Sequence, residues 1–328
     1  MISLLDAQWL LRRNFYAIKS HAYPSYNQLI SSFLSSVCNI CEECGGFDVF
    51  LVWDKGPYMK ESYLTLKTTR YYARESDVVE IPPDVSEEER KKLEETNKWI
   101  LEQAAMESEF RHAKNFLLKM SRGFGLPSVF YSGYEADDLA YIIANELGIK
   151  TDIKFLTKDS DWINLMGPTT EFVRLTKNKE YYSYKNTEVG KVPLLIKGIL
   201  ASLIEGNHND IEVLNLGVSL KEALNIYENS GWNEGDWMFA TNHDKDSVHK
   251  FIERAKALDP RTFLTDEIKS SLLTQLQVQT PIIDGNSLSD LCKKTGIRCN
   301  FWKILNLNSR RRKTLNLFEE TVIKFPEI

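Results

Sequence analysis

Acidic side chains gather in five short segments of the chain, and their placement is typical of a site for divalent cations. Three predicted strands are each followed by one or two acids, a predicted helix begins with three more, and a later loop adds one. The eight side chains are Asp6, Asp54, Glu135, Asp137, Asp138, Asp159, Asp161 and Asp210. If these segments converge, as the carboxyl ends of parallel strands do, the carboxylates meet in one pocket.

Such a pocket has a definite chemistry, because carboxylates at close range raise one another's pKa and destabilise the fold. Hard divalent cations relieve this repulsion, and Mg²⁺ or Mn²⁺ prefer oxygen ligands. Two ions about 4 Å apart can activate a water molecule and stabilise the leaving oxygen of a phosphodiester. The sequence has only five histidines and no His-Glu-x-x-His motif, so the acids predict a site for two Mg²⁺ or Mn²⁺ ions.

Helix capping is the alternative explanation for each acid taken alone. A single Asp at the end of a strand is commonly an N-cap or turn residue, and the helix macrodipole favours acids in a first turn. Capping explains the combination less well, because Glu-Ala-Asp-Asp-Leu at 135–139 is followed about twenty residues later by Lys-Asp-Ser-Asp at 158–161. The combination favours a functional site, with Asp161 as a catalytic candidate.

The elements that must position these acids alternate between strands and helices. Strands are expected at residues 2–5, 49–53 and 152–156, and helices at 25–44, 86–119 and 133–147. The first of these helices should stop at Gly45-Gly46. Strands that alternate with helices predict an α/β fold with a mostly parallel sheet.

The chain divides into two predicted parts. Strand patterns fade beyond residue 185 and helical patterns dominate to about residue 260, so we place the boundary between a domain 1–185 and a domain 186–328. A length of 328 residues agrees with one larger and one smaller unit.

Charge is unevenly distributed along the chain. The net charge of −5, taken alone, disfavours a nucleic-acid binder, because phosphate contacts need Lys and Arg. Residues 250–313, however, contain 13 Lys and Arg against 6 Asp and Glu. No run of 18 apolar residues is present and the amino terminus lacks a basic signal-peptide stretch, so we expect a cytoplasmic protein with reduced thiols.

Cys38, Cys41 and Cys44 form a Cys-x-x-Cys-x-x-Cys pattern that suggests zinc. A structural zinc needs four ligands, and no fourth Cys or His stands nearby at the usual spacing. The three residues lie in a predicted helix, where buried thiols are the better interpretation.

The acidic motifs resemble those of the 5′ nuclease superfamily, which includes flap endonucleases, polymerase-associated 5′–3′ exonucleases and the phage ribonuclease H that removes primers. Tyr134-Glu135-Ala136-Asp137-Asp138 matches the Tyr-Glu-Ala-Asp-Asp motif of that family, and Asp159-Ser160-Asp161 matches its Asp-x-Asp. Asp6 and Asp54 match its first two strand-end acids, and the resemblance extends from Asp6 to about Ala223.

The resemblance implies a PIN-like parallel-sheet domain followed by a mainly helical region with a helix-three-turn-helix motif. It also implies hydrolysis of phosphodiesters at 5′ ends of DNA, or of RNA paired to DNA, as in RNA primer removal during replication. The implied partners of a monomeric enzyme are DNA with a 5′ flap or nick and RNA–DNA hybrids, and also a sliding clamp or a single-strand-binding protein. A phage-encoded enzyme of this kind would act in the host cytoplasm.

Two other functions stay open. An RNA-cutting PIN-type ribonuclease would use similar acids, although the helix-three-turn-helix and the basic carboxyl-terminal part argue against it. A non-catalytic protein that binds DNA structures would keep the scaffold, although the intact set of acids argues against that function.

Several basic residues take roles by the same resemblance. The stretch from Tyr58 to Arg70 resembles a family segment in which Lys67 and Arg70 would face the scissile phosphate. Cations there would offset negative charge in the transition state, and a solvated surface pair is the alternative. The family's earlier Arg falls on Met59, and the neighbouring Lys60 is the DNA-binding candidate.

The helix-three-turn-helix of the family corresponds to residues 216–221, where Gly217, Ser219 and Lys221 are DNA-binding candidates. Backbone amides there would hold a phosphate or a potassium ion, and an ordinary helix–helix turn is the alternative.

A basic run near the carboxyl terminus comprises Arg310, Arg311, Arg312 and Lys313, and we expect it to contact the DNA backbone. Residues 314–318 faintly resemble peptides that bind sliding clamps, and a packed terminal helix is the alternative.

The segment 84–122 corresponds to the arch that family members place over the active site. It contains 9 Asp and Glu and 8 Lys and Arg, with three consecutive acids at 87–89. A solvated helix with ion pairs along its surface is the alternative to a gate through which a single strand threads.

The last acidic motif departs from the family pattern Gly-Asp-x-x-Asp-Asn-Ile, since Gly206 is followed by Asn207. A neutral amide in place of a carboxylate weakens the site of the second metal ion, with Asp210 as the remaining ligand candidate. The substitution Asn207→Asp should therefore lower the Mg²⁺ concentration that gives half-maximal cleavage. An unchanged Mg²⁺ titration would contradict this hypothesis.

Overall fold

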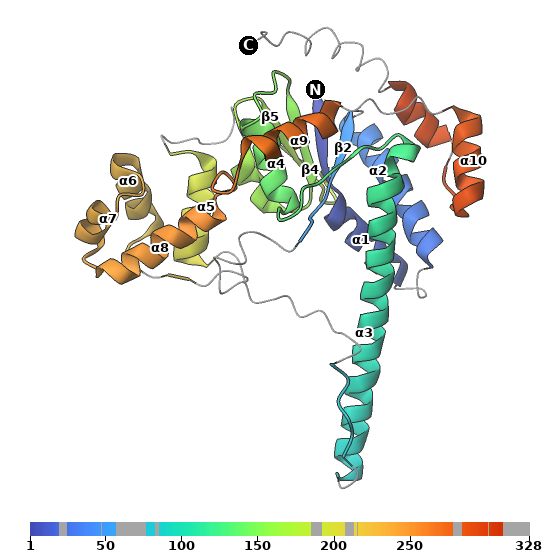
Figure 1. Ribbon diagram of the computed structural model, residues 1–328, viewed down its shortest axis with the longest axis horizontal. Coiled ribbons are helices and arrows are strands. Elements are labelled where there is room, and N and C mark those ends of the chain that lie inside the picture. Colours follow the sequence, from blue (N-terminus) through green and yellow to red (C-terminus); the bar gives the residue numbers. More distant parts are fainter. Residues whose placement is uncertain are drawn as a thin grey trace.

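The computed structural model describes residues 1–19, 25–46, 48–56, 77–82, 85–184, 192–206, 213–214, 216–277, 284–300 and 302–310. Within these residues, the centre is a six-stranded sheet with the strand order β3-β2-β1-β4-β5-β6 (Figure 1). The strands are β1 (Ile2–Asp6), β2 (Val49–Val52), β3 (Ser128–Val129), β4 (Ile153–Thr157), β5 (Thr170–Arg174) and β6 (Glu180–Ser183). All neighbours are parallel except β5 and β6, so the predicted mostly parallel sheet is confirmed.

Alternating side chains on the central strands build two cores, one on each face of the sheet. In β1, Leu4 belongs to one core and its neighbour Leu5 to the other, and both are fully buried. Successive strand residues point to opposite faces, so a strand covered on both faces must be apolar at nearly every position. This burial explains the apolar runs from which β1, β2 and β4 are predicted.

Three strands lie outside the sequence-based expectation. β3 has only two residues, and β5 and β6 form an antiparallel pair at the edge of the sheet. The edge strands are only partly covered, with Glu171 exposed in β5 and Tyr181 exposed in β6. None of the three carries the continuous apolar run of a central strand.

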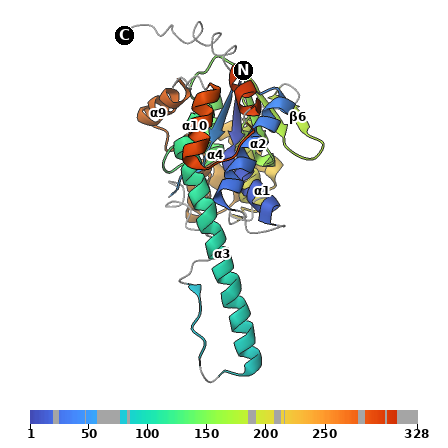
Figure 2. The ribbon, with the colours of Figure 1, turned by 90° about the vertical axis from the view of Figure 1, so that its right-hand side faces the viewer.

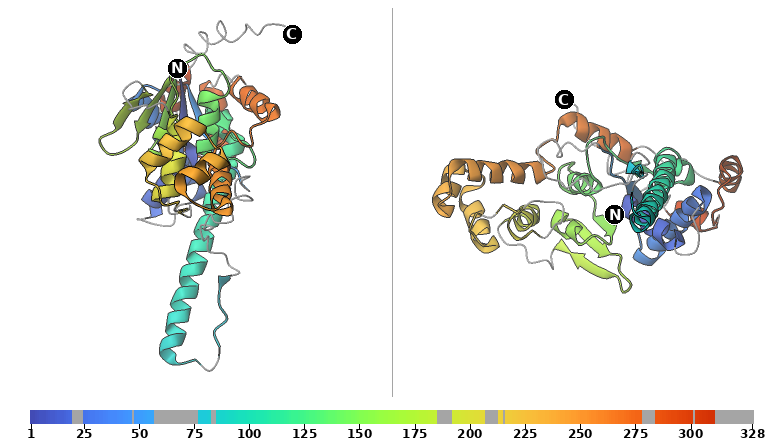
Figure 3. Two further views of the ribbon diagram at one scale, coloured as in Figure 1. Left: turned by 90° about the vertical axis from the view of Figure 1, so that its left-hand side faces the viewer. Right: turned by 90° about the horizontal axis from the view of Figure 1, so that it is seen from below.

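Helices cover both faces of the sheet (Figures 1 and 3). One core contains residues of α1 (Ala7–Lys19), α2 (Tyr26–Cys44) and α3 (Glu87–Met120). The other contains residues of α4 (Ala136–Asn145), α5 (Leu194–Glu205), α6 (Leu220–Ser230), α7 (Glu234–Thr241), α8 (Lys245–Leu258) and α9 (Asp266–Gln277). The predicted helical carboxyl-terminal region is thus confirmed. Among the described residues, no helix combines the length and apolar character that a membrane crossing requires.

Both ends of α2 follow standard capping rules. Ser25 and Gln28 form a reciprocal capping box, and Gly45 ends the helix in the left-handed conformation with φ of 67°. The predicted stop at Gly45 is confirmed. Cys38, Cys41 and Cys44 are buried along this helix, which confirms the interpretation as buried thiols.

α3 is the longest helix in the described part of the chain and projects beyond the rest of the molecule (Figure 2). It has 34 residues, which corresponds to about 51 Å. Ser86 and Glu89 form its capping box. The segment 77–82 lies along it, because the Asn97 amide bonds the backbone nitrogen of Val79 at 2.9 Å and its oxygen at 2.7 Å.

The last helices return to the sheet. Gln275 in α9 bonds both the backbone nitrogen of Phe130 (3.0 Å) and its oxygen (3.1 Å), next to the edge strand β3. Residues of α10 (Gly285–Thr295) and of the helical segment 302–310 join the core of α1, α2 and α3. The carboxyl-terminal region is therefore packed against both sides of the sheet domain.

Gly125 makes a close contact in this packing. It follows the turn η3 (Ser121–Phe124) with φ of +75°, and an added Cβ would lie 1.8 Å from Oδ1 of Asn308. The buried Asn308 amide donates to the backbone oxygens of Phe124 (3.4 Å) and Ile304 (2.8 Å).

We predict that Gly125→Ala lowers the free energy of unfolding by about 3 kcal/mol, from left-handed strain together with displacement of Asn308. The matched control is Gly148→Ala, at φ +64° with no atom within 4 Å of the added Cβ. The control should lose only about 1 kcal/mol. Urea denaturation measures both, and equal losses would contradict the role of the Asn308 contact.

Candidate metal centre

Asp6 occupies the carboxyl end of the central strand β1, level with Val52 of β2. Its side chain is 8% exposed. The Trp9 backbone N–H donates to Oδ1 at 2.9 Å, and the Thr157 hydroxyl donates to Oδ2 at 2.9 Å. The first bond caps α1 and the second joins β1 to the end of β4, so Asp6 is fixed from two sides.

Asp54 connects the end of β2 to the start of α4. Its Oδ1 accepts a 2.7 Å hydrogen bond from the backbone N–H of Ala136. The next residue, Lys55, pairs with the chain just before α4, donating from its N–H to the Tyr134 oxygen (3.0 Å) and accepting from the Gly133 N–H (2.7 Å). The acidic start of α4 is thereby held next to Asp54.

Three acids meet at the start of α4. Ligand oxygens of Glu135, Asp137 and Asp138 lie within 4.8 Å of one another. Capping accounts for part of this arrangement, since Oδ2 of Asp138 accepts from the Glu135 N–H at 3.1 Å. Glu135 completes a reciprocal capping box with Asp138, and Oδ1 of Asp137 accepts from the Asp138 N–H at 2.8 Å, so capping orients all three carboxylates.

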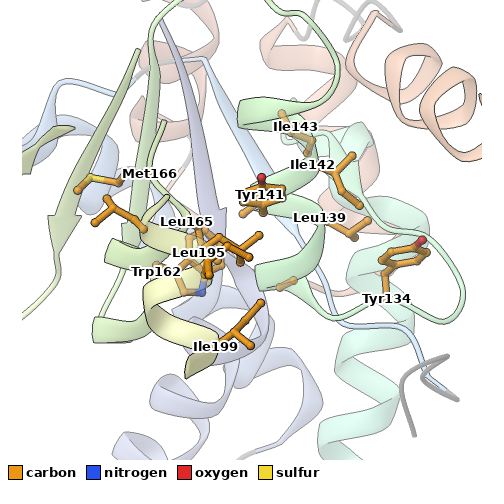
Figure 4. Close-up of a cluster of buried hydrophobic side chains, with 14 of the residues drawn as sticks. Tyr134, Leu139, Tyr141, Ile142, Ile143, Trp162, Leu165, Met166, Leu195 and Ile199 are labelled. Carbon is orange, nitrogen blue, oxygen red and sulfur yellow. The ribbon is translucent and has the colours of Figure 1, made fainter. Parts of the chain in front are cut away.

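The apolar side of α4 fixes the position of these acids. Leu139 and Ile142 are fully buried below the acidic turn, in the same core as Trp162, Leu195 and Ile199 of the neighbouring elements (Figure 4). The helix therefore cannot shift without opening that core.

Asp159 and Asp161 follow β4, with Asp159 capping the 3₁₀ turn η4 (Ser160–Leu165) and Asp161 in its first turn. The Asp159 N–H donates to the Thr157 hydroxyl at 3.1 Å, and the Asp161 N–H donates to Oδ1 of Asp159 at 3.0 Å. Thr157 thus bonds both the Asp6 carboxylate and the backbone of Asp159. This hydroxyl links two of the predicted acidic segments directly.

The carboxylates also interact electrostatically. The pKa of Asp6 is raised to about 7. Burial is the largest cause, and the charges of Asp54 and Asp159 also raise it. Burial likewise raises the pKa of Asp54, with additional contributions from Glu135 and Asp137, against the lowering effect of the Ala136 N–H. Asp6, Asp54, Asp159 and the acidic start of α4 are therefore near enough to act on one another electrostatically.

This donor set fits a hard divalent cation. The oxygens of Glu135, Asp137 and Asp138 are close together, and burial followed by the neighbouring carboxylates raises the pKa of Asp6. A cation of charge +2 relieves that repulsion, and Mg²⁺ and Mn²⁺ prefer such oxygens.

Lys114 is a neighbour of the site that sequence reasoning does not select. Its Nζ donates to Oε1 of Gln8 at 2.5 Å, and its charge lowers the pKa of Asp54. No local pattern reveals this placement, because Lys114 lies 106 residues from Gln8 along the chain.

The structure describes four of the other sequence-predicted residues, and it links none of these four to the acidic site. Gly217 has φ of +67°, Ser219 caps α6 in a box with Glu222, and Lys221 is exposed in the first turn of that helix. Arg310 is exposed at the end of the last described segment. The residues outside the described part of the chain are Lys60, Lys67, Arg70, Asn207, Asp210, Arg311 and Arg312.

Known proteins share this architecture. Residues 1–191 match the family model described as "5′-3′ exonuclease, N-terminal resolvase-like domain". A phage T5 protein co-crystallised with metal ions is similar with a TM-score of 0.53 at 16% identity, over 94% of this chain and 99% of that chain. The T5 5′-exonuclease with bound divalent zinc gives a TM-score of 0.52 at 17% identity, over 94% and 99%. At these identities the two structures show a common fold. No curated protein sequence matches the chain.

The raised pKa of Asp6 predicts how pH and Mg²⁺ affect stability. Below about pH 4 this carboxyl is protonated in both the folded and the unfolded chain. Between about pH 4 and 7 only the unfolded chain ionises, so the metal-free fold loses stability as the pH rises, by about 4 kcal/mol in total. If Mg²⁺ binds the ionised carboxylates, it should restore that loss.

We therefore expect saturating Mg²⁺ to raise the melting temperature by several degrees more at pH 8 than at pH 5. Thermal unfolding with and without a chelator measures this difference, and Asp6→Asn should reduce it. An equal effect of Mg²⁺ at both pH values would contradict the role of these carboxylates.

Proposed function

The chain belongs to the 5′–3′ exonuclease family, and from this premise we propose that it hydrolyses phosphodiesters at the 5′ ends of DNA, or of RNA paired to DNA, in a reaction that depends on Mg²⁺ or Mn²⁺. The observation that carries the proposal is the joining of carboxylates from β1, β2, α4 and the turn after β4 in one site. A site that gathers acids from four segments is suited to the metal-assisted cleavage of a phosphate ester.

The acids divide into two groups in this proposal. Asp6, Asp54 and Glu135, with Asp137 or Asp138, would hold the first ion. The second would lie at Asp159, Asp161 and Asp210. The metal ions and the zinc in the two T5 structures belong to those proteins and support a metal requirement here. Divalent ions in such a centre supply an activated water molecule and offset the charge of the phosphate.

The residues of the chain position these groups. Thr157 and the Trp9 N–H orient the carboxylate of Asp6, and the Ala136 N–H orients that of Asp54. Lys67 and Arg70 would face the scissile phosphate and offset the negative charge that grows on it. Their cationic side chains complete a site that otherwise repels its anionic substrate.

Substrate binding extends over both predicted domains, 1–185 and 186–328. The helical region would hold the duplex backbone through Gly217, Ser219 and Lys221, with a potassium ion at the same turn. The further contacts are assigned to Lys60, Arg310, Arg311 and Arg312. The projecting helix α3 corresponds to the arch segment 84–122 and would stand beside the 5′ strand.

The biological role that follows is removal of RNA primers during replication, by a monomer that acts on a 5′ flap, a nick or an RNA–DNA hybrid. A sliding clamp and a single-strand-binding protein are the partners that such a role implies. The excess of basic residues between 250 and 313 is the electrostatic basis for binding the nucleic-acid substrate.

Cleavage assays with 5′-labelled substrates test this function. In Mg²⁺ the protein should cut a flap, a nicked duplex and an RNA–DNA hybrid faster than single-stranded RNA, and excess chelator should stop the reaction. Asp161→Asn should reduce the rate at least about a thousandfold, because it removes a ligand charge, while DNA binding is retained.

The matched control is Asp152→Asn, which changes an exposed acid just before β4, at the opposite end of that strand from the metal centre. This variant should cleave at the rate of the parent protein. A parent protein that cuts none of the paired substrates, or an Asp161→Asn variant with full activity, would contradict the proposed function.

A further inference from the structure

Lys114 lies where α3 crosses the first turn of α1. Its Nζ donates a 2.5 Å hydrogen bond to the side-chain oxygen of Gln8, two residues after Asp6. The ammonium group is half-buried at this crossing. Lys114 is therefore anchored on the helical turn that the Asp6 carboxylate caps.

Neighbouring contacts hold this face of α3 against α1. Arg12 forms two hydrogen bonds with Glu107, at 3.3 and 3.4 Å, and its guanidinium lies 4.2 Å from the ring centre of Phe110. Glu107, Phe110 and Lys114 are spaced by three and four residues, so they lie on one side of the helix. The position of Nζ is thus set by packing on either side of it.

Lys114 acts on the acidic site through its charge but forms no ion pair there with the described residues. It acts electrostatically on the Asp54 carboxylate, yet among the described residues no carboxylate oxygen lies within 4.0 Å of Nζ. Within the same residues Nζ makes one hydrogen bond, to Gln8. An ammonium group has three donors, so two of them have no acceptor among the described residues.

We propose that Lys114 binds a phosphate of the substrate strand beside the metal centre, with Gln8 holding its Nζ in place. The inference rests on the proposed nuclease function and names a cation for it on α3 itself. A phosphodiester that enters a cluster of carboxylates meets like charge. A cation fixed next to the cluster offsets that repulsion and binds the strand through one oxygen.

The expected effect is on substrate binding. Lys114→Met keeps most of the side-chain volume and removes the charge, and it should raise KM for a 5′-flap DNA about tenfold. In the cleavage-deficient Asp161→Asn background, the same change should weaken DNA binding at 0.1 M salt. It should also reduce the slope of log Kd against log salt by about one, the signature of one lost phosphate contact.

Two variants complete the design. Lys114→Arg keeps the positive charge and should stay within about threefold of the parent protein. Lys150→Met removes an exposed lysine before β4, at the strand end away from the metal centre, and should leave KM and the salt slope unchanged. Melting temperatures of all variants show whether each one is folded, and an unfolded Lys114→Met is replaced by Lys114→Gln in the same assays.

Three outcomes decide the inference. A higher KM with a lower salt slope and an unchanged Mg²⁺ midpoint supports phosphate binding. An altered Mg²⁺ midpoint with an unchanged salt slope would overturn it, because Lys114 would then act only through Asp54. If the parent protein is active and Lys114→Met leaves KM and the salt slope unchanged, the inference about Lys114 is also overturned and the nuclease function stands. An inactive parent protein overturns both the inference and the nuclease function.

Discussion

The rest of the structure depends on one constraint, which is the close approach of carboxylates at the carboxyl ends of β1, β2 and β4. Asp6 is buried, and its pKa near 7 expresses the energy needed to ionise it beside Asp54 and Asp159. The Trp9 N–H and the Thr157 hydroxyl each donate to one oxygen of Asp6, and both bonds lower the energy of ionisation. The pKa of Asp6 stays raised in spite of these two bonds. A divalent cation bound there would offset the charge of these carboxylates.

The fold creates this pocket because parallel strands deliver their carboxyl ends to one edge. Two apolar cores hold the strands in place. Leu4 and Leu5 of β1 point to opposite faces of the sheet, so this one strand contributes to both cores. The same cores seat α4, so its acidic first turn meets Asp54 through the Ala136 N–H. The carboxyl-terminal helices then return to cover the sheet, with Gln275 of α9 bonded to Phe130 beside β3.

The positions of the described acids could be predicted from the sequence, because each of them stands at a recognisable local boundary. β1, β2 and β4 are apolar runs that end next to acids, and α2 and α3 carry clear capping residues at Ser25 and Ser86. The prediction extends to the convergence of acids, since strand ends share an edge in any parallel sheet.

Other features could not be predicted because they depend on tertiary contacts. β5 and β6 are edge strands whose sequences lack a continuous apolar run, and β3 has only two residues. α1 begins directly after β1, and its cap is Asp6, a residue that is also a candidate metal ligand. The role of Lys114 rests on a contact between residues 106 positions apart. Long-range pairing of this kind leaves no periodic signal along the chain.

Diffraction from crystals grown with Mn²⁺, recorded at the manganese absorption edge, tests the central claim most directly. Anomalous density should lie among the carboxylates of Asp6, Asp54 and Glu135, with a second peak at Asp159 and Asp161. Such peaks should be absent in crystals of an Asp6→Asn variant or weaker by a large factor. A protein that is active in Mn²⁺ but shows no anomalous density at this edge of the sheet would contradict the claim that these carboxylates form the metal centre.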